Sequence, residues 1–143
     1  MNEVWDLPPN DRLKIWRIFR KSIEGKDNDF VIQSIVDWWK TTPVSNRITD
    51  IYDSSTWPDP WELIHMGEFD ENTICIGMAY TLHLIDKPCD VLLLQDRKKH
   101  YIGLTILVDE TVVLNYNYGT INKYEEIENA TILNRWNTED LIK

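Results

Sequence analysis

Some residue types are scarce in this chain of 143 residues, and their scarcity excludes whole classes of site. The five glycines are scattered and form no phosphate-binding loop of the kind that holds a nucleotide. The three histidines and two cysteines stand at no spacing typical of a zinc site, so we expect no metal and no other cofactor. No apolar run approaches the roughly 18 residues of a membrane-spanning helix, so we expect no membrane contact.

Positive charge is also scarce. Lys and Arg number 15 against 24 Asp and Glu, which gives a formal net charge of -9 at pH 7. A chain this acidic is repelled by phosphate backbones, and its densest basic stretch covers only residues 97–99. We therefore interpret that stretch as a solvated turn and expect no direct binding to nucleic acid.

Residues 1–7 contain neither a basic leader nor an apolar run, so nothing there predicts a targeting segment. We expect the protein to be cytoplasmic where it is synthesised, in a host cytoplasm if it is viral. A reducing compartment argues against a structural disulfide. Cys75 and Cys89 are then two free thiols.

The bulk composition is that of an ordinary folded domain. Hydrophobic residues make up 43% and charged residues 27%, and the length suits a single domain, residues 1–143, with a core of its own. Seven Trp in so short a chain are unusual. Large aromatic side chains serve cores, peptide clefts and interfaces alike, so their number alone does not choose among these roles.

Periodic apolar residues predict a helical N-terminal part, residues 1–43. Residues 12–23 and 28–40 repeat apolar side chains at helical intervals, and Gly25 and Pro43 stand just beyond their ends. Both helices have the pattern of structural elements that pack on the rest of the domain.

A further helix is predicted over residues 74–86, with Asn72 or Thr73 as its N-cap. Beyond it the apolar period changes from that of a helix to that of a strand, and residues 91–95, 101–108 and 111–116 are typical of strands. The last two strands form an antiparallel hairpin. Because helices come first and strands second, the expected fold class is α+β, with the Cys-bearing helix packed on a small antiparallel sheet.

Cys75 is a candidate nucleophile because the predicted helix places it in the first turn, where the helix dipole stabilises a thiolate. Such a thiol needs a base, and His100 stands at the head of a predicted strand. The imidazole is in turn oriented by an Asn or Asp. A hairpin turn at residues 109–110 makes Asn117 the nearest diagonal neighbour of His100, whereas a shifted turn or a bulge favours Asn115. Both remain candidates.

The order of these elements resembles the core of transglutaminase-like proteins, which have a papain-like fold. The resemblance covers about residues 67–119: a helix opening on TICIGMA at 73–79, a strand beginning with His100, and a strand ending in Leu114 and Asn115. In that family Cys, His and Asp or Asn perform acyl transfer or amide hydrolysis through a thioester. The resemblance implies that Cys75 attacks an amide or peptide carbonyl, that His100 shuttles the proton, and that Asn115 or Asn117 orients the imidazole.

Other features of the sequence oppose catalysis. Phe69 occupies the position where a papain-like protein has its oxyanion-hole Gln. Acidic residues at 68, 70 and 71 precede the helix, and carboxylates close to a thiol raise its pKa. Cys75 also shares a helical face with apolar residues, as a buried structural cysteine does. His100 and the two asparagines equally suit plain surface and turn positions.

The segment WPDPWE at 57–62 precedes this core. Trp57 and Trp61, held by two prolines, form either a rigid wall of a substrate or partner cleft or a cover of the core, and a short helix is expected from Pro60 to Gly67. The segment resembles Trp-Pro-x-Pro-Trp-Glu stretches that precede a transglutaminase-like core in short proteins of tailed bacteriophages.

Two functions are therefore expected from the sequence. The first is a cysteine-dependent enzyme of the transglutaminase or peptidase type, which acts on an amide or peptide bond. The alternative is a non-enzymatic structural or interaction protein of a tailed-phage virion, a head, neck or tail component on the same fold. Both predict a protein or peptide partner, and the second adds other virion proteins as partners and a place in the virion.

Overall fold

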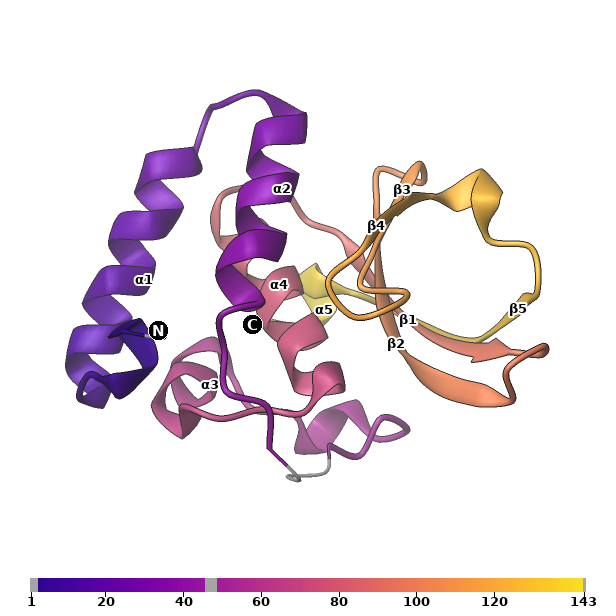
Figure 1. Ribbon diagram of the computed structural model, residues 1–143, viewed down its shortest axis with the longest axis horizontal. Coiled ribbons are helices and arrows are strands. Elements are labelled where there is room, and N and C mark those ends of the chain that lie inside the picture. The colour runs from indigo at the N-terminus through magenta and orange to yellow at the C-terminus, as the bar shows by residue number, and fades with distance from the viewer. Residues whose placement is uncertain (1–2, 46–48, 143) are drawn as a thin grey trace.

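The computed structural model describes residues 3–45 and 49–142, and within them a group of helices packs against one face of an antiparallel sheet (Figure 1). The helices are α1 (Pro9–Ile23), α2 (Asn28–Trp39), α3 (Pro60–Met66), α4 (Glu71–Leu84) and α5 (Thr138–Leu141). The strands are β1 (Asp90–Asp96), β2 (Tyr101–Val108), β3 (Val112–Leu114), β4 (Ile121–Lys123) and β5 (Ala130–Asn137). Short 3-10 helices lie at Glu3–Asp6, Ser54–Thr56 and Tyr124–Glu126. The predicted α+β class is confirmed, and none of the described helices is long and apolar enough to cross a membrane.

Helix α4 is the central element of the structure. In Figure 1 it lies between α1 and α2 on one side and the sheet on the other. Every residue from Thr73 to Leu82 is buried, so most of the helix has no face toward solvent. A helix that is apolar on all sides is typical of a core position. The other elements are therefore arranged around α4.

Two tryptophans from different helices meet α4 at one hydroxyl. Trp16 of α1 and Trp39 of α2 are fully buried, and each donates its indole N–H to Thr81 Oγ1, at 3.1 and 2.9 Å. Thr81 donates in turn to the Gly77 carbonyl at 2.8 Å. A buried N–H without a partner costs about 1–3 kcal/mol, so this single hydroxyl makes the burial of both rings possible.

Gly77 lets the Trp39 ring lie directly on the backbone of α4. A Cβ at this position would stand 2.6 Å from Cζ3 of the ring, well inside van der Waals contact. We expect Gly77→Ala to lower the free energy of unfolding by about 1–3 kcal/mol, because the ring has no free space to move into and the overlap outweighs the better helix propensity of Ala. Urea unfolding followed by tryptophan fluorescence measures the change. Lys14→Ala, an exposed substitution on α1, is the control, and equal stability of the two variants would contradict the close packing.

Helix α4 begins at Glu71 rather than at residue 74, so the predicted start and the predicted N-caps were wrong. Asp70 is the N-cap, because its carboxylate accepts both the Thr73 amide, at 2.6 Å, and the Thr73 hydroxyl, at 2.7 Å. The same carboxylate accepts the Thr49 amide at 2.9 Å, which fixes the preceding loop to the helix. As a consequence Cys75 lies in the second turn of α4 and not in the first.

The sheet has the strand order β4-β3-β2-β1-β5, and all neighbours are antiparallel. In the β2–β3 hairpin Val108 pairs with Val112, so the turn has three residues, 109–111, in place of the predicted two. Positive φ angles of 52° and 60° at the first two turn residues allow this register. Strand β3 then ends at Leu114. The register that would bring Asn117 beside His100 therefore does not form.

The C-terminal part adds two strands, β4 and β5, that were not predicted from the sequence. Strand β5 pairs along the whole of β1, with Leu133 as an extra residue where the register shifts. Between β4 and β5 the chain covers the face of the sheet that is turned away from α4. That face has a small core of its own, which consists of Leu92, Leu94, Leu107 and Val113 with Tyr116, Tyr124, Ile127 and Ala130 packed against it.

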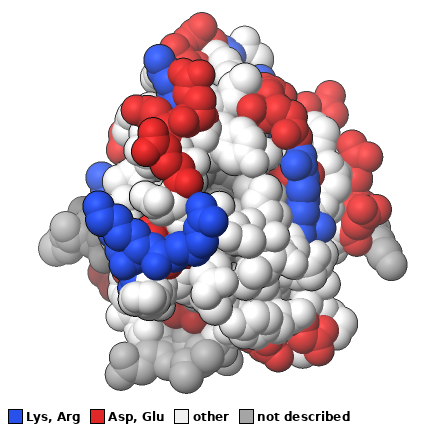
Figure 2. Space-filling view, turned by 90° about the vertical axis from the view of Figure 1, so that its right-hand side faces the viewer, with Lys and Arg blue, Asp and Glu red and all other residues white. Residues whose placement is uncertain are grey.

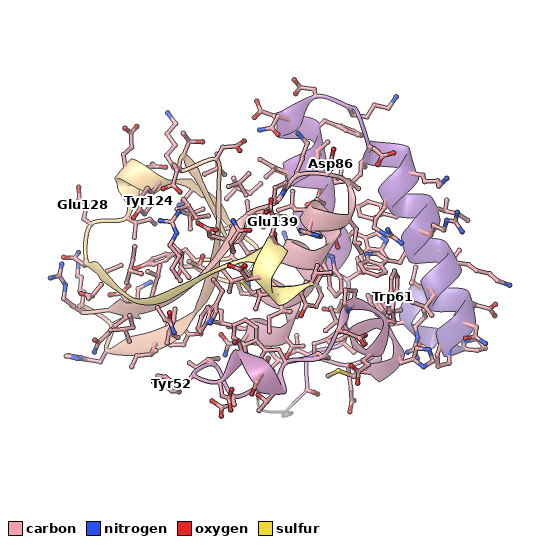
Figure 3. All side chains as sticks on the ribbon, turned by 180° about the vertical axis from the view of Figure 1, so that it is seen from behind. Tyr52, Trp61, Asp86, Tyr124, Glu128 and Glu139 are labelled. Atoms are coloured by element: carbon pink, nitrogen blue, oxygen red, sulfur yellow. The ribbon has the colours of Figure 1, made fainter. Side chains whose placement is uncertain are left out.

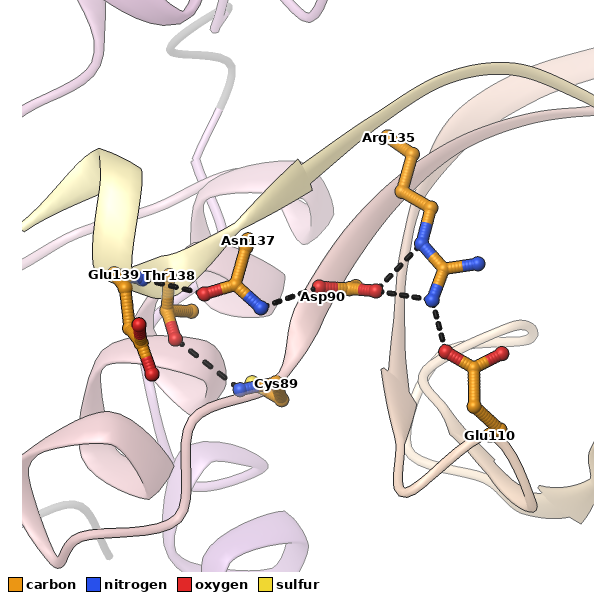
Figure 4. A network of polar contacts seen from close by, with 7 residues as sticks. All are labelled: Cys89, Asp90, Glu110, Arg135, Asn137, Thr138 and Glu139. Carbon is orange, nitrogen blue, oxygen red and sulfur yellow. Dashed lines mark hydrogen bonds and ion pairs between the residues drawn. The ribbon is translucent and has the colours of Figure 1, made fainter.

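A polar network fixes the C-terminal elements to the start of β1 (Figure 4). The buried Thr138 hydroxyl of α5 accepts the Cys89 amide at 3.1 Å. Arg135 of β5 forms ion pairs with Asp90 of β1 and with Glu110 of the β2–β3 turn. Strand β5 and helix α5 are thus held by contacts with residues that are far away in the sequence.

Candidate functional site

The Cys75 thiol is fully buried in the core. Burial raises the pKa of Cys75 well above its ordinary value, and the neighbouring Cys89 acts in the same direction. A thiol in this environment is protonated at neutral pH, whereas the thiolate is the nucleophile. In this conformation Cys75 therefore behaves as a core residue.

His100 lies in the exposed turn between β1 and β2 rather than in a strand. Its φ angle is 55°, and its imidazole makes no hydrogen bond to any described residue. No hydrogen bond joins it to Cys75, whose sulfur is enclosed by the core. Joint action of these two residues in catalysis stays a prediction.

The two candidate asparagines stabilise the loop that follows β3. Asn115 is buried, donates from Nδ2 to the Glu71 carbonyl at 3.3 Å, and accepts the Gly119 amide at Oδ1 at 2.8 Å. Asn117 is exposed and accepts Lys99 Nζ at 3.1 Å. Neither asparagine is bonded to a histidine, so neither orients an imidazole in this conformation.

A cleft of about 390 Å³ opens between β2 and the loop after β3. This volume lies within the range of ligand pockets in proteins. Its walls come from the first turn of α4, the β1–β2 hairpin and the loop between β3 and β4. The lining residues are Glu71, Asn72, Leu94, Asp96, Lys99, Tyr101, Gly103, Leu104, Thr105, Asn115, Tyr116, Asn117 and Tyr118.

Three of these lining residues stand where α4, β2 and β3 meet. Asn72, in the first turn of α4, accepts the Leu104 amide of β2 at Oδ1 at 2.9 Å. Asn115, directly after β3, is bonded to Glu71, the residue before Asn72. The three elements thus bring together two side-chain amides and one aliphatic side chain. Neither a thiol nor an imidazole lines this cleft.

Two tyrosines form the more exposed part of the cleft. Tyr101 lies across Gly103, where a Cβ would stand 2.6 Å from the tyrosine hydroxyl, and the ring is still 48% exposed. Partial burial and the charge of Glu71 raise the pKa of Tyr101 and also that of Tyr118. The Glu71 carboxylate is therefore within electrostatic reach of both hydroxyls.

A third tyrosine fixes the two loops of the cleft to each other. The Tyr116 hydroxyl donates to Asp96 at 2.7 Å, and the same carboxylate accepts the Lys98 and Lys99 amides, each at 3.0 Å. These hydrogen bonds lower the pKa of Asp96, while burial and the bond to Asp96 raise the pKa of Tyr116 to about 12. The loop after β3 is thus held against the β1–β2 turn.

Most of the residues that line this cleft were not predicted from the sequence. Asn115 and Asn117 were named for a different role, and Asn72 only as a helix cap. One signal was present, because the stretch NYNYG at 115–119 joins turn-forming residues to aromatic ones directly after a strand. That combination is typical of a surface loop that contacts a ligand or a partner protein.

The tryptophans of the WPDPWE segment line a different, more open groove of about 1180 Å³. Trp57 is nearly buried, donates from Nε1 to the Asp50 carbonyl at 2.7 Å, and packs against Trp136. Trp61 is 50% exposed and lies on α3 with its ring against Trp16 of α1 (Figure 3). Of the two, only Trp61 presents a substantial surface to a partner.

Charge is unevenly distributed over the surface. On the sheet side, shown in Figure 2, the largest group of basic side chains lies at the left, and acidic side chains spread above it and to the right. The predicted basic turn, residues 97–99, is exposed. Within residues 3–45 and 49–142, no group of three or more His, Cys, Asp or Glu side chains is placed to hold a metal ion.

Solved structures of LapG from Legionella pneumophila match nearly the whole chain. Calcium-bound LapG covers 96% of this chain and 81% of its own, with a TM-score of 0.74 at 14% identity. An EGTA-treated LapG covers 91% and 74%, with a TM-score of 0.71 at 15% identity. A further LapG structure covers 90% and 75%, with a TM-score of 0.71 at 12% identity.

The fold is transglutaminase-like. The fold expected from the resemblance is thereby confirmed, with the transglutaminase-like cysteine protease architecture of LapG. Identities this low concern the fold alone, because one fold supports many functions. No protein-family model matches the sequence, and no curated protein matches it either. The comparisons give no support to a tailed-phage type.

The two thiols offer a direct test of the buried position of Cys75. We expect iodoacetamide to label Cys75 and Cys89 slowly in the folded protein and rapidly in urea, because both sulfurs are enclosed and burial raises the pKa of both thiols. At a pH equal to the pKa of an ordinary thiol, the thiols of Cys75 and Cys89 are still protonated, so their labelling stays slow. Mass spectrometry of digested peptides gives the two rates. Fast labelling of Cys75 alone, with a pH midpoint below that of a free thiol, would contradict this result and favour an enzyme.

Proposed function

We propose that the protein is a non-catalytic binding protein, which holds a segment of a partner protein in the cleft of a transglutaminase-like fold. The observation that carries this proposal is the set of residues that α4, β2 and β3 bring together, namely Asn72, Leu104 and Asn115. Cysteine-dependent acyl transfer needs an ionisable thiol in contact with a base. The cleft has neither group, and the buried thiol and the exposed imidazole of the chain lie outside it.

The chemistry of the cleft suits a polypeptide. Its tyrosine rings supply flat amphipathic contact surface, and its side-chain amides and hydroxyls supply adaptable hydrogen bonds. Apolar contact is provided by Leu94 and Leu104. Protein interfaces are enriched in such aromatic residues and carry a polar rim.

The rival function is acyl transfer or amide hydrolysis through a thioester on Cys75, with His100 and Asn115 or Asn117 as its partners. It requires a rearrangement that exposes the buried sulfur of Cys75 to a substrate and brings it into contact with the imidazole of His100. The tightly bonded loops of the cleft oppose that rearrangement. The structural role in a tailed-phage virion, virion partners and a cytoplasmic location stay predictions.

A peptide-display experiment tests the proposed function. A library of random linear dodecapeptides is selected on the wild-type protein, and the recovered peptides are measured against Gly103→Val, in which the new side chain meets the Tyr101 ring and fills the cleft. We expect these peptides to bind the variant at least about tenfold more weakly, which corresponds to about 1.4 kcal/mol. Circular dichroism and a urea midpoint establish that the variant is folded.

Two further variants separate the alternatives. Cys75→Ala keeps the cleft intact, so peptide affinity should stay within about twofold, whereas a covalent mechanism predicts that this variant no longer releases product from the same peptides. Trp61→Ala removes the exposed ring of the second groove and should also leave affinity unchanged. Cys75-dependent cleavage of a recovered peptide would refute the non-catalytic function.

A further inference from the structure

Strand β2 is much longer than its partner β3. It has eight residues and β3 has three, so pairing on that side covers only Ile106–Val108. Tyr101–Thr105 pair with β1 on one side and with no strand of the described residues on the other. More than half of the β3-facing edge of β2 is therefore free of strand pairing in the interior of the sheet, and the cleft lies along it.

The backbone and the hydrogen bonds of the loop after β3 keep this part of the β2 edge unpaired. Asn115 follows β3 with a φ angle of 64°, which turns the chain away from β2. The loop that results is fixed by the Asn115 bonds to Glu71 and Gly119, and by the Tyr116 bond to Asp96. With the loop held in this way, β3 does not extend to cover the remaining edge.

The free edge presents backbone groups in a regular pattern. The Leu104 amide points away from β1, because it donates to Asn72 Oδ1. Amide and carbonyl groups of alternate residues point to the same side of a strand, so the amide and carbonyl of Ile102 and the carbonyl of Leu104 also point away from β1, toward the free side of the strand. These backbone groups therefore have the orientation that would let them form hydrogen bonds with one more strand beside β2.

We propose that the cleft binds an extended polypeptide segment as an added β-strand along Tyr101–Thr105 of β2. This inference rests on the proposed function and names its binding mode. Main-chain hydrogen bonds to Ile102 and to the Leu104 carbonyl supply affinity in such a complex, and pockets for alternate side chains supply specificity. Asn72 also takes part in this pairing. Its Oδ1 accepts the Leu104 amide, and its Nδ2, bonded to no described residue, donates to a carbonyl of the added strand.

Charge complementarity favours a basic residue in the bound segment. Asp96 of the cleft accepts three hydrogen bonds, and Lys99 donates to Asn117. The Glu71 carboxylate is exposed, and no described cation forms an ion pair with it. A Lys or Arg side chain that projects toward the start of α4 would neutralise Glu71, so we infer that the segment carries one there.

Backbone methylation of the selected dodecapeptides tests the binding mode. Each amide nitrogen of a recovered peptide is methylated in turn, and affinity for the wild-type protein is measured by isothermal titration calorimetry. In an added strand, methylation at every second residue removes a ladder hydrogen bond and lowers affinity about tenfold or more, while the residues between tolerate it. Recognition by side chains alone gives no such period of two.

Amide hydrogen exchange of the protein provides a second measurement that needs no variant. Peptide binding should slow exchange of the Ile102 amide about tenfold or more, because the amide becomes bonded to the added strand. The Gly103 amide points to β1 and should change little. An unchanged Ile102 amide in a saturated complex would overturn the added strand.

Two conservative variants test the side chains that the binding mode uses. Asn72→Asp keeps the acceptor for the Leu104 amide and removes the Nδ2 donor, so affinity should fall about fivefold or more without loss of the fold. Glu71→Gln should lower the affinity for basic peptides and make that affinity less dependent on salt. Glu125→Gln, an exposed substitution outside the cleft, is the control and should change neither.

The outcomes distinguish the two proposals. Peptides that compete for the cleft but show no period of two and no protection of Ile102 overturn the added strand and leave the proposed function standing. Recovery of no peptide that discriminates wild type from Gly103→Val overturns both. Period-two sensitivity together with Ile102 protection supports both.

Discussion

The enclosure of α4 on all sides is the constraint on which the rest of this structure depends. Trp16 and Trp39 share the Thr81 hydroxyl, and the Trp39 ring rests on Gly77, so the helix is fixed against α1 and α2 while its other side packs on β1 and β2. A helix held in this way presents only its first turn to the cleft. Side chains in that turn are accessible to a ligand, and a thiol one turn deeper is a core side chain.

The sequence predicted the elements better than the site. Apolar periodicity identified α1, α2 and the first three strands, because their burial is regular along the chain. It did not identify β5, whose side chains are mostly exposed and which forms through pairing with a distant strand. Near the start of α4, Asp70, Asn72 and Thr73 are all residue types that commonly cap a helix. The prediction chose Asn72 or Thr73 instead of Asp70, and for that reason it placed Cys75 in the first turn. The cleft, in turn, is built from elements far apart in sequence, and no local pattern specifies how they meet.

The transglutaminase-like fold of this chain illustrates how architecture and chemistry separate. The start of α4, strand β2 and the residue after β3 meet at the cleft, and the side chains that they bring there are the amides of Asn72 and Asn115, the carboxylate of Glu71 and the aliphatic side chain of Leu104. The Asn72 amide keeps its Nδ2 donor unbonded to any described residue, and such a donor suits recognition of a main-chain carbonyl.

The extra residue Leu133 in β5 bears on how the molecule behaves among copies of itself. An outer strand with unpaired amides is a template for association, and a bulge that twists it away is a common protection. At the opposite end of the sheet β4 has only three residues, too few to seed a stable ladder. With both edge strands protected, the stretch of β2 that pairs with no described strand on its β3 side is the part of this sheet left open to another chain, and it lies in the interior of the sheet rather than at an edge.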